Sequence, residues 1–312
     1  MYSRQAKTGD KRMSLSEAVE KFIPDGSYLH IGGHGGGRSF CTVFEIIRQH
    51  KKHLTVSGMG MWQDMDILVG AGVADRIECS WHGLETGLSV CIRRAVEKGL
   101  PHPIEYLETS HFSNTCRLMA SALGLPFMPT KSLFGSDMLE WAEKEGIAAV
   151  IEDPFTGEKV VAMKALEPDV GIMHVQKADM FGNCQVWGYL GDDDWGNRAC
   201  KHLIVTCEEL VDSKELMLDP NRVLIPGFMV DAVVEVPKGS HPWGVTGYYK
   251  NDQEFVAEYI AAAKDEEKFA EYLDKYIYSV KTFDEYLEKI GAERWERLEV
   301  QQVFSKPVCY GS

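Results

Sequence analysis

Residues 27–38 read Ser-Tyr-Leu-His-Ile-Gly-Gly-His-Gly-Gly-Gly-Arg, a short apolar strand that runs directly into a glycine-rich loop, and a helical pattern follows over residues 39–50. Glycines let a backbone approach a ligand closely, and the N-terminus of a helix offers free N–H groups to an anion. We therefore predict a ligand-binding loop, with a ligand-free tight turn as the alternative. The residues of this loop are Gly32, Gly33, His34, Gly35, Gly36, Gly37 and Arg38.

The same strand–loop–helix unit repeats further along the chain. Strands are predicted at 54–57, 76–80 and 104–107, each followed by a short connection and a helical pattern. This alternation favours an α/β fold with an open, mostly parallel sheet that is flanked by helices on both faces. Residues 124–155 are less regular. Further strands are expected at 159–165, 169–176, 184–187, 202–207 and 231–236.

The pattern predicts one domain with a helical appendage. The predicted boundaries are a flexible N-terminus at 1–13, an α/β domain at 14–250, its helical C-terminal extension at 251–300 and a tail at 301–312. No polar linker long enough to separate two domains and no repeat of solenoid period is present.

Composition excludes several classes of protein. Acidic residues outnumber basic ones 47 to 33 in the 312 residues, which gives a net charge of −14. A surface this acidic repels phosphate backbones and anionic lipids, so we expect neither a nucleic-acid nor a membrane partner. The eight cysteines form no C-x-x-C pair, which favours buried, reduced thiols in the cytoplasm over disulfides or a metal site.

Glu108 is the main candidate for acid–base chemistry. It stands where a predicted strand passes into a helix, at the edge where open α/β sheets place their sites. A carboxylate there can serve as a general base or orient a substrate, and a charge that simply favours the helix start is the alternative. Trp62 and Trp81 would floor an apolar pocket or pack in the core. Further candidates in the loops after the strands are Ser57, Met59, Gly60, Trp81, His82 and Gly83.

Several separated motifs resemble the alpha subunits of class I CoA-transferases, the glutaconate CoA-transferase group above all. Besides Gly32-Gly33 after a short strand, they include Leu-Gly-Leu-Pro-Phe-Met-Pro at 123–129, Val-Thr-Cys-Glu-Glu at 205–209 and Phe-Asp-Glu-Tyr-Leu at 283–287. The likeness runs from about residue 14 to about residue 300 in the family's order. The glycine loop departs from it, because Gly-Gly-His replaces the usual Gly-Gly-Phe.

The resemblance implies a heteromer with a beta subunit of the same family and a site between the two chains. A glutamate of the beta subunit would attack an acyl-CoA, and this chain would supply pocket walls. Coenzyme A thioester and a carboxylic acid would then be substrates, with no tightly bound cofactor. Relatives on this fold that open steroid rings or decarboxylate make a hydrolase or decarboxylase with Glu108 as base the alternative. A non-catalytic acyl-CoA-binding subunit is the third possibility.

Overall fold

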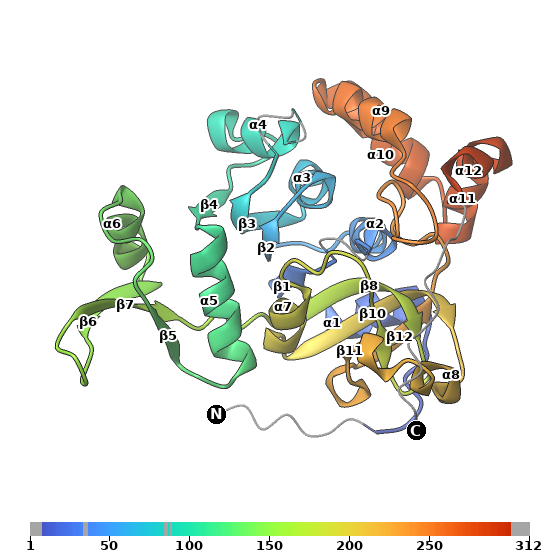
Figure 1. Cartoon of the computed structure of the whole chain (residues 1–312). Helices are drawn as coiled ribbons and strands as arrows, with labels where there is room; N and C mark the ends of the chain where they lie inside the picture. The colour runs from blue at the N-terminus through green and yellow to red at the C-terminus, as the bar shows by residue number, and fades with distance from the viewer. Residues whose placement is uncertain (1–7, 34–36, 84–86, 88, 301–312) are drawn as a thin grey trace.

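A mostly parallel sheet, flanked by helices, runs through the molecule and confirms the predicted fold class (Figure 1). The computed structural model describes residues 8–33, 37–83, 87 and 89–300. Within them, nine strands form the main sheet in the order β11-β9-β8-β1-β2-β3-β4, with β10 paired to β8 and β12 paired to β10. All its pairings are parallel except those of β9 with β8 and of β11 with β9. The strands are β1 (Tyr28–Ile31), β2 (Leu54–Gly60), β3 (Ala74–Trp81), β4 (Glu105–Glu108), β8 (Val170–Ala178), β9 (Cys184–Gln185), β10 (His202–Leu210), β11 (Val223–Ile225) and β12 (Ala232–Glu235).

Helices connect these strands and extend beyond them. They are α1 (Leu15–Phe22), α2 (Phe40–Arg48), α3 (Gln63–Gly70), α4 (Val90–Lys98), α5 (His111–Ala122), α7 (Asp193–Ala199), α8 (Ser213–Met217), α9 (Gln253–Ala263), α10 (Glu266–Leu273), α11 (Phe283–Ile290) and α12 (Ala292–Leu298). Helix α1 shows how local sequence sets a boundary. The Ser14 hydroxyl accepts the Glu17 N–H, and the Glu17 carboxylate accepts the Ser14 N–H, so both backbone donors are satisfied.

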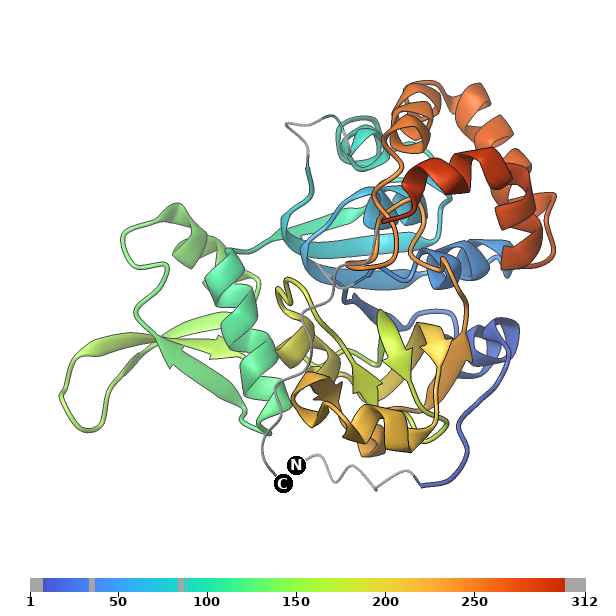
Figure 2. The same ribbon diagram turned by 45° about the vertical axis from the view of Figure 1, so that its right-hand side comes forward.

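The C-terminal helices share one hydrophobic core with the first half of the chain. Buried side chains of α2, α3 and α4 form a continuous cluster with those of α9 to α12. Phe44 of α2, for example, meets the ring of Tyr286 on α11 edge to face, with the ring centroids 5.2 Å apart. Figures 1 and 2 show these last helices beside α2, over one face of the sheet. The packing joins segments separated by about 200 residues.

A second, small sheet replaces the irregular structure that we expected over residues 124–155. Three antiparallel strands, β5 (Phe127–Thr130), β6 (Ala148–Glu152) and β7 (Lys159–Lys164), pair in the order β5-β7-β6, and α6 (Asp137–Lys144) lies between β5 and β6 in the chain. Pro129 stands in β5, which is an edge strand and therefore tolerates the missing donor. This unit projects from the main sheet (Figure 2).

Two further expectations change near the N-terminus and in β2. Residues 11–13, which we predicted to be flexible, lie along β12, where Met13 N donates to Val233 O at 3.2 Å. The strand predicted at 54–57 continues to Gly60, because β1 and β3 flank β2 on both sides. The seven described cysteines are free and buried, as predicted, and Cys309 lies outside the described residues. In the described part of the chain, every helix is too short or too polar to cross a membrane.

Candidate functional site

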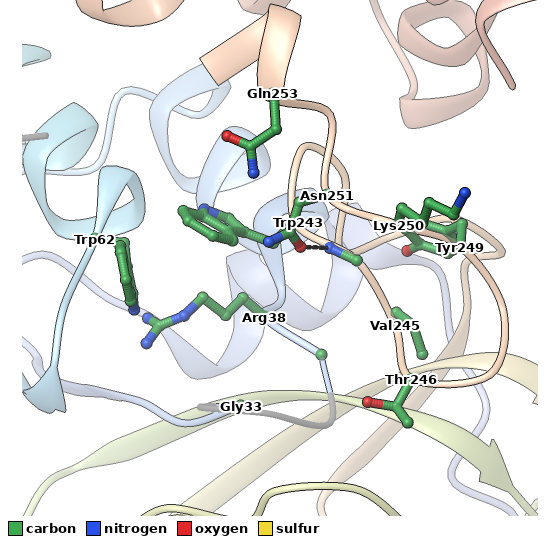
Figure 3. Close-up of a pocket in the computed structure, with 12 residues that line it drawn as sticks. Gly33, Arg38, Trp62, Trp243, Val245, Thr246, Tyr249, Lys250, Asn251 and Gln253 are labelled. Carbon is green, nitrogen blue, oxygen red and sulfur yellow. Dashed lines mark hydrogen bonds between the residues drawn. The ribbon is translucent and has the colours of Figure 1, made fainter. Parts of the chain in front are cut away.

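A cavity of about 640 Å³ opens at the carboxyl ends of β1 and β2 (Figure 3). Gly33 follows β1 and Trp62 follows β2, and the far wall comes from the segment between β12 and α9. In Figure 3, Trp62, Trp243 and Gln253 surround a common space above Arg38. The described lining residues are Gly33, Gly37, Arg38, Trp62, Trp243, Gly244, Val245, Thr246, Tyr249, Lys250, Asn251 and Gln253. The cavity thus lies at the edge of the sheet where the sequence placed a site.

The ends of the glycine loop approach each other at the cavity wall. Gly33 has φ of +91°, a backbone conformation that L side chains rarely adopt, and a Cβ there would overlap the carbonyl oxygen of Gly37. Gly32 is equally confined, since a Cβ would lie 2.9 Å from Asn197 Oδ1. Glycine is therefore required for the close approach that the sequence predicted. His34, Gly35 and Gly36 lie outside the described residues.

The described amides of this loop and of the helix after it have acceptors within the protein. Gly32 N donates to Ile172 O at 3.0 Å, and Gly33 N donates to the carboxylate of Asp193. Arg38 N donates to Ser240 Oγ at 2.8 Å, and Cys41 N in the first turn of α2 donates to Gly239 O at 2.9 Å. Our expectation that these N–H groups are free for an anion is therefore wrong, because tertiary contacts already satisfy them.

Arg38 is buried and makes a structural ion pair. Its guanidinium group contacts the carboxylate of Asp64 and the carbonyl oxygen of Gly60, and its side chain is 5% exposed. Asp64 also accepts the N–H groups of Trp62 at 3.0 Å and Met65 at 2.9 Å. The ion pair thereby fixes the start of α3 beside the cavity. The predicted role of Arg38 in pinning a ligand carboxylate is contradicted by this buried partner, although the side chain does line the cavity.

Three tryptophans meet next to the cavity. The ring centroids of Trp62 and Trp81 are 4.7 Å apart, and those of Trp62 and Trp243 are 4.8 Å apart. Sequence analysis singled out Trp62 and Trp81 but missed Trp243, which follows His241-Pro242 in a connection far along the chain. A tryptophan in a glycine- and proline-rich connection after a strand was the available signal. The cluster gives the cavity an apolar wall.

Behind Gly37, a buried ion pair supports the loop from the side of the sheet. His174 on β8 hydrogen bonds from Nε2 to Glu208 Oε1 at 2.7 Å and from Nδ1 to Thr206 Oγ1 at 2.8 Å. Burial lowers the pKa of His174, but hydrogen bonds with Cys41 and Glu208 outweigh it and raise that pKa to about 9. Tyr249 donates its hydroxyl to Glu208 at 2.9 Å. The loop therefore rests on a charged, fully hydrogen-bonded layer.

The remaining predicted residues lie at the same edge of the sheet but outside the cavity lining. Glu108 ends β4, the terminal strand of the sheet, and its side chain is exposed. Ser57 is completely buried inside β2, where it hydrogen bonds with His30, so its predicted place in a pocket loop is wrong. Two more predicted pocket residues lie in β2, the buried Met59 and Gly60, and three lie at the end of β3, namely Trp81, His82 and Gly83.

Comparison with known proteins agrees with this architecture. Residues 12–236 match the family described as Coenzyme A transferase. The chain therefore belongs to the Coenzyme A transferase family and is an enzyme subunit of that family.

Its relatives are alpha subunits of two-subunit enzymes. The chain is 38% identical to the alpha subunit of 3-oxoadipate CoA-transferase from Pseudomonas knackmussii, with 89% of this chain and 98% of the relative covered. It is 35% identical to the alpha subunit of glutaconate CoA-transferase from Acidaminococcus fermentans, with 93% and 95% covered. The crystal structure of glutaconate coenzyme A-transferase from that organism superposes with a TM-score of 0.86 at 32% identity, over 93% of this chain and 96% of that chain.

A relative with a different activity has the same fold. The crystal structure of a variant of the decarboxylase AibA/AibB matches with a TM-score of 0.73 at 31% identity, over 86% of this chain and 98% of that chain. Fold similarity by itself therefore does not select between transfer and decarboxylation.

Proposed function

We propose that this chain is the alpha subunit of a heteromeric CoA-transferase that moves CoA between an acyl-CoA and a carboxylic or dicarboxylic acid. The names of its relatives, alpha subunits of glutaconate and 3-oxoadipate CoA-transferases, support a dicarboxylic acid as one substrate. The same names support a beta subunit as partner. The coenzyme A thioester enters as a substrate, and the proposal requires no tightly bound cofactor.

One observation carries the division of labour between the subunits. The described residues that line the cavity include an arginine and a lysine but no aspartate or glutamate. A carboxylate nucleophile must then reach the cavity from outside this set, which supports a glutamate of the beta subunit. The walls of this chain instead offer a neutral to cationic, partly aromatic surface to reactants that carry carboxylates.

The proposed reaction proceeds by covalent catalysis. The beta-subunit glutamate attacks the thioester carbonyl, the C–S bond breaks and CoA thiolate leaves, which gives a mixed acyl anhydride. The thiolate then attacks the glutamyl carbonyl, releases the first carboxylate and forms glutamyl-CoA. The acceptor carboxylate repeats the two steps in reverse. In this scheme, Trp62 and Trp243 exclude water, which would otherwise hydrolyse the anhydride.

Trapping the covalent intermediate tests this function. The complex with its beta subunit is incubated with acetyl-, succinyl- and glutaryl-CoA, and then treated with borohydride or hydroxylamine. We expect mass spectrometry to find a reduced or hydroxamate-modified glutamate on the beta subunit, and no such product with this chain alone. Glutaconate and 3-oxoadipate are the acceptors to supply for complete turnover. Thioester consumption without any trapped glutamate would contradict a transferase.

The second candidate is a hydrolase or decarboxylase that uses Glu108 as base. The similarity to a decarboxylase and the position of Glu108 at the carboxyl edge of the sheet favour it. It predicts that Glu108→Gln abolishes turnover while acyl-CoA binding survives. The transferase mechanism predicts a mild effect of E108Q and a complete loss when the beta-subunit glutamate is replaced. The two substitutions, measured side by side, separate the candidates.

A further inference from the structure

The two described ends of the glycine loop are anchored by side chains from distant segments. Gly33 N donates to the carboxylate of Asp193 at the start of α7, and Arg38 N donates to Ser240 Oγ at 2.8 Å. Asp193 and Ser240 are both completely buried. Their positions lie 160 and 202 residues further along the chain than the amides that they accept. Two independent elements therefore converge on one loop.

We propose that Asp193 and Ser240 are positioning residues, which hold Gly33 and Gly37 where the cavity needs them during CoA transfer. This inference rests on the proposed function, because it assigns the loop's purpose to that reaction. Gly33 and Gly37 line the cavity and come into contact there. Anchoring the amide of Gly33 and the amide that follows Gly37 fixes this contact from both sides.

The conformation of the loop explains why anchors are needed. Glycine loses more backbone freedom on folding than any other residue, and Gly33 adopts a φ of +91°. A loop end of this kind keeps one geometry only if neighbouring groups determine it. A hydrogen bond from a buried N–H to a carboxylate is shorter and stronger than one to a neutral acceptor. Asp193 therefore supplies a firmer anchor than a neutral side chain would.

The surroundings of Asp193 hold it in turn. Asn197, one turn further along α7, donates from Nδ2 to the carbonyl oxygen of Asp193 at 2.8 Å, and the same side chain packs against Gly32. Asp193 N donates to Leu190 O at 3.0 Å. The completely buried His30 packs against α7 as well, because a Cβ on Gly196 would overlap its Nε2 atom. An apolar residue in place of Asp193 would bury at lower cost but would leave the Gly33 N–H without this acceptor.

The consequence for catalysis is a change in kcat rather than in substrate affinity. The anchors touch the loop from behind and do not line the cavity themselves. Loss of an anchor leaves the lining residues present but misplaced, and a misplacement of about 1 Å costs about 100-fold in rate. We therefore expect Asp193→Ala to lower kcat between about 10-fold and about 100-fold, with KM for the acyl-CoA changed by less than about threefold.

Three variants of the complex with its beta subunit test the proposal. D193A removes the acceptor, whereas D193N keeps an amide oxygen that can accept the Gly33 N–H. D194A is the matched control, because Asp194 has the same charge on the same helix but pairs with Arg198 at 2.8 Å. CoA transfer from succinyl-CoA to glutaconate is measured per beta-subunit glutamate trapped, so that a smaller folded fraction does not lower the value. We expect D193N to retain kcat within about fivefold of wild type and D194A to match wild type.

Amide hydrogen exchange at Gly33 gives a readout that does not depend on activity. Exchange there should accelerate by about tenfold or more in D193A and remain slow in D193N and D194A. The proposal is overturned if D193A keeps its kcat within twofold or leaves Gly33 exchange unchanged, or if D193N behaves like D193A. Should D193A fail to fold, Ser240→Ala decides by the same two measurements, with Arg38 exchange in place of Gly33. If wild type transfers no CoA, the proposed function fails, and Gly33 exchange alone then decides whether Asp193 is an anchor.

Discussion

Asp66 makes the stability of the chain depend on pH. Its carboxylate is completely buried on α3, where it accepts the hydroxyl of Tyr259 at 2.6 Å and the N–H of Ile92 at 2.8 Å. It thus joins α3 to both α4 and α9. Burial raises the pKa of Asp66 to about 6, although the hydrogen bonds from Tyr259 and Ile92 oppose that rise.

The sign and size of the effect follow from linkage. The pKa rises from the ordinary 3.8 to about 6, so the native state binds the proton more tightly than the unfolded state does. The stabilisation that protonation provides is complete below about pH 4 and is lost as pH rises through about 6. Two pKa units correspond to about 3 kcal/mol. Asp66→Asn carries no titrating group, so its free energy of unfolding should gain about 3 kcal/mol on wild type between pH 4 and pH 7.

Guanidinium denaturation of the purified chain from pH 4 to pH 8 measures this difference. Tyr259→Phe removes a hydrogen bond that lowers the pKa of Asp66, so it should destabilise more at pH 7.5 than at pH 4.5. Glu97→Gln is the control, because this acid of α4 lies on the surface beside Arg93. If the curves of D66N and wild type run parallel across the whole range, the argument from burial is refuted.

Three further predictions concern other contacts. Glu208→Gln should destabilise by about 3 to 5 kcal/mol at pH 6.5 and by less at pH 9.5, because the buried His174 loses its charged partner and the wild-type pair itself weakens as pH rises through about 9; denaturation at the two values measures this. Gly196→Ala should destabilise by about 1 to 3 kcal/mol, because its Cβ would overlap His30, and the thermal midpoint reports it. Phe155→Ser, at a side chain 94% exposed, should alter the free energy of unfolding of the isolated chain by less than about 0.5 kcal/mol, a result that a drop in its denaturation midpoint would contradict.

The main sheet was predictable because strand and helix alternate over short range. Each parallel strand is apolar and bounded by glycine, and the residues of β8 are buried on both faces. The small sheet was missed because Pro129 disfavours a strand unless that strand lies at an edge, and edge position is a property of the assembled sheet. The packing of Phe44 on Tyr286 was also beyond local patterns, since no periodicity links residues this far apart.

The site was predictable in its glycines and not in its opposite wall. Gly33 and Gly37 could be found because backbone approach requires glycine at specific positions. The role of Arg38 was misjudged because its partner, Asp64, is 26 residues away and becomes a neighbour only after β2 pairs with β1. Trp243 lies still further along the chain. Sequence patterns indicate which residues can form a site, whereas tertiary packing decides which of them face it.

The exposure of Glu108 constrains the mechanism that could use it. A carboxylate becomes an effective base near neutral pH when burial raises its pKa, but Glu108 is exposed at the end of β4. Because β4 is the terminal strand of the sheet, a partner that covers this edge would bury the carboxylate. Any catalytic effect of E108Q should therefore depend on the assembled complex, and acyl-CoA binding to this chain alone should be indifferent to it. The cavity near Gly33 is already walled by this chain, which is why the transferase mechanism needs from its partner a nucleophile rather than a cover.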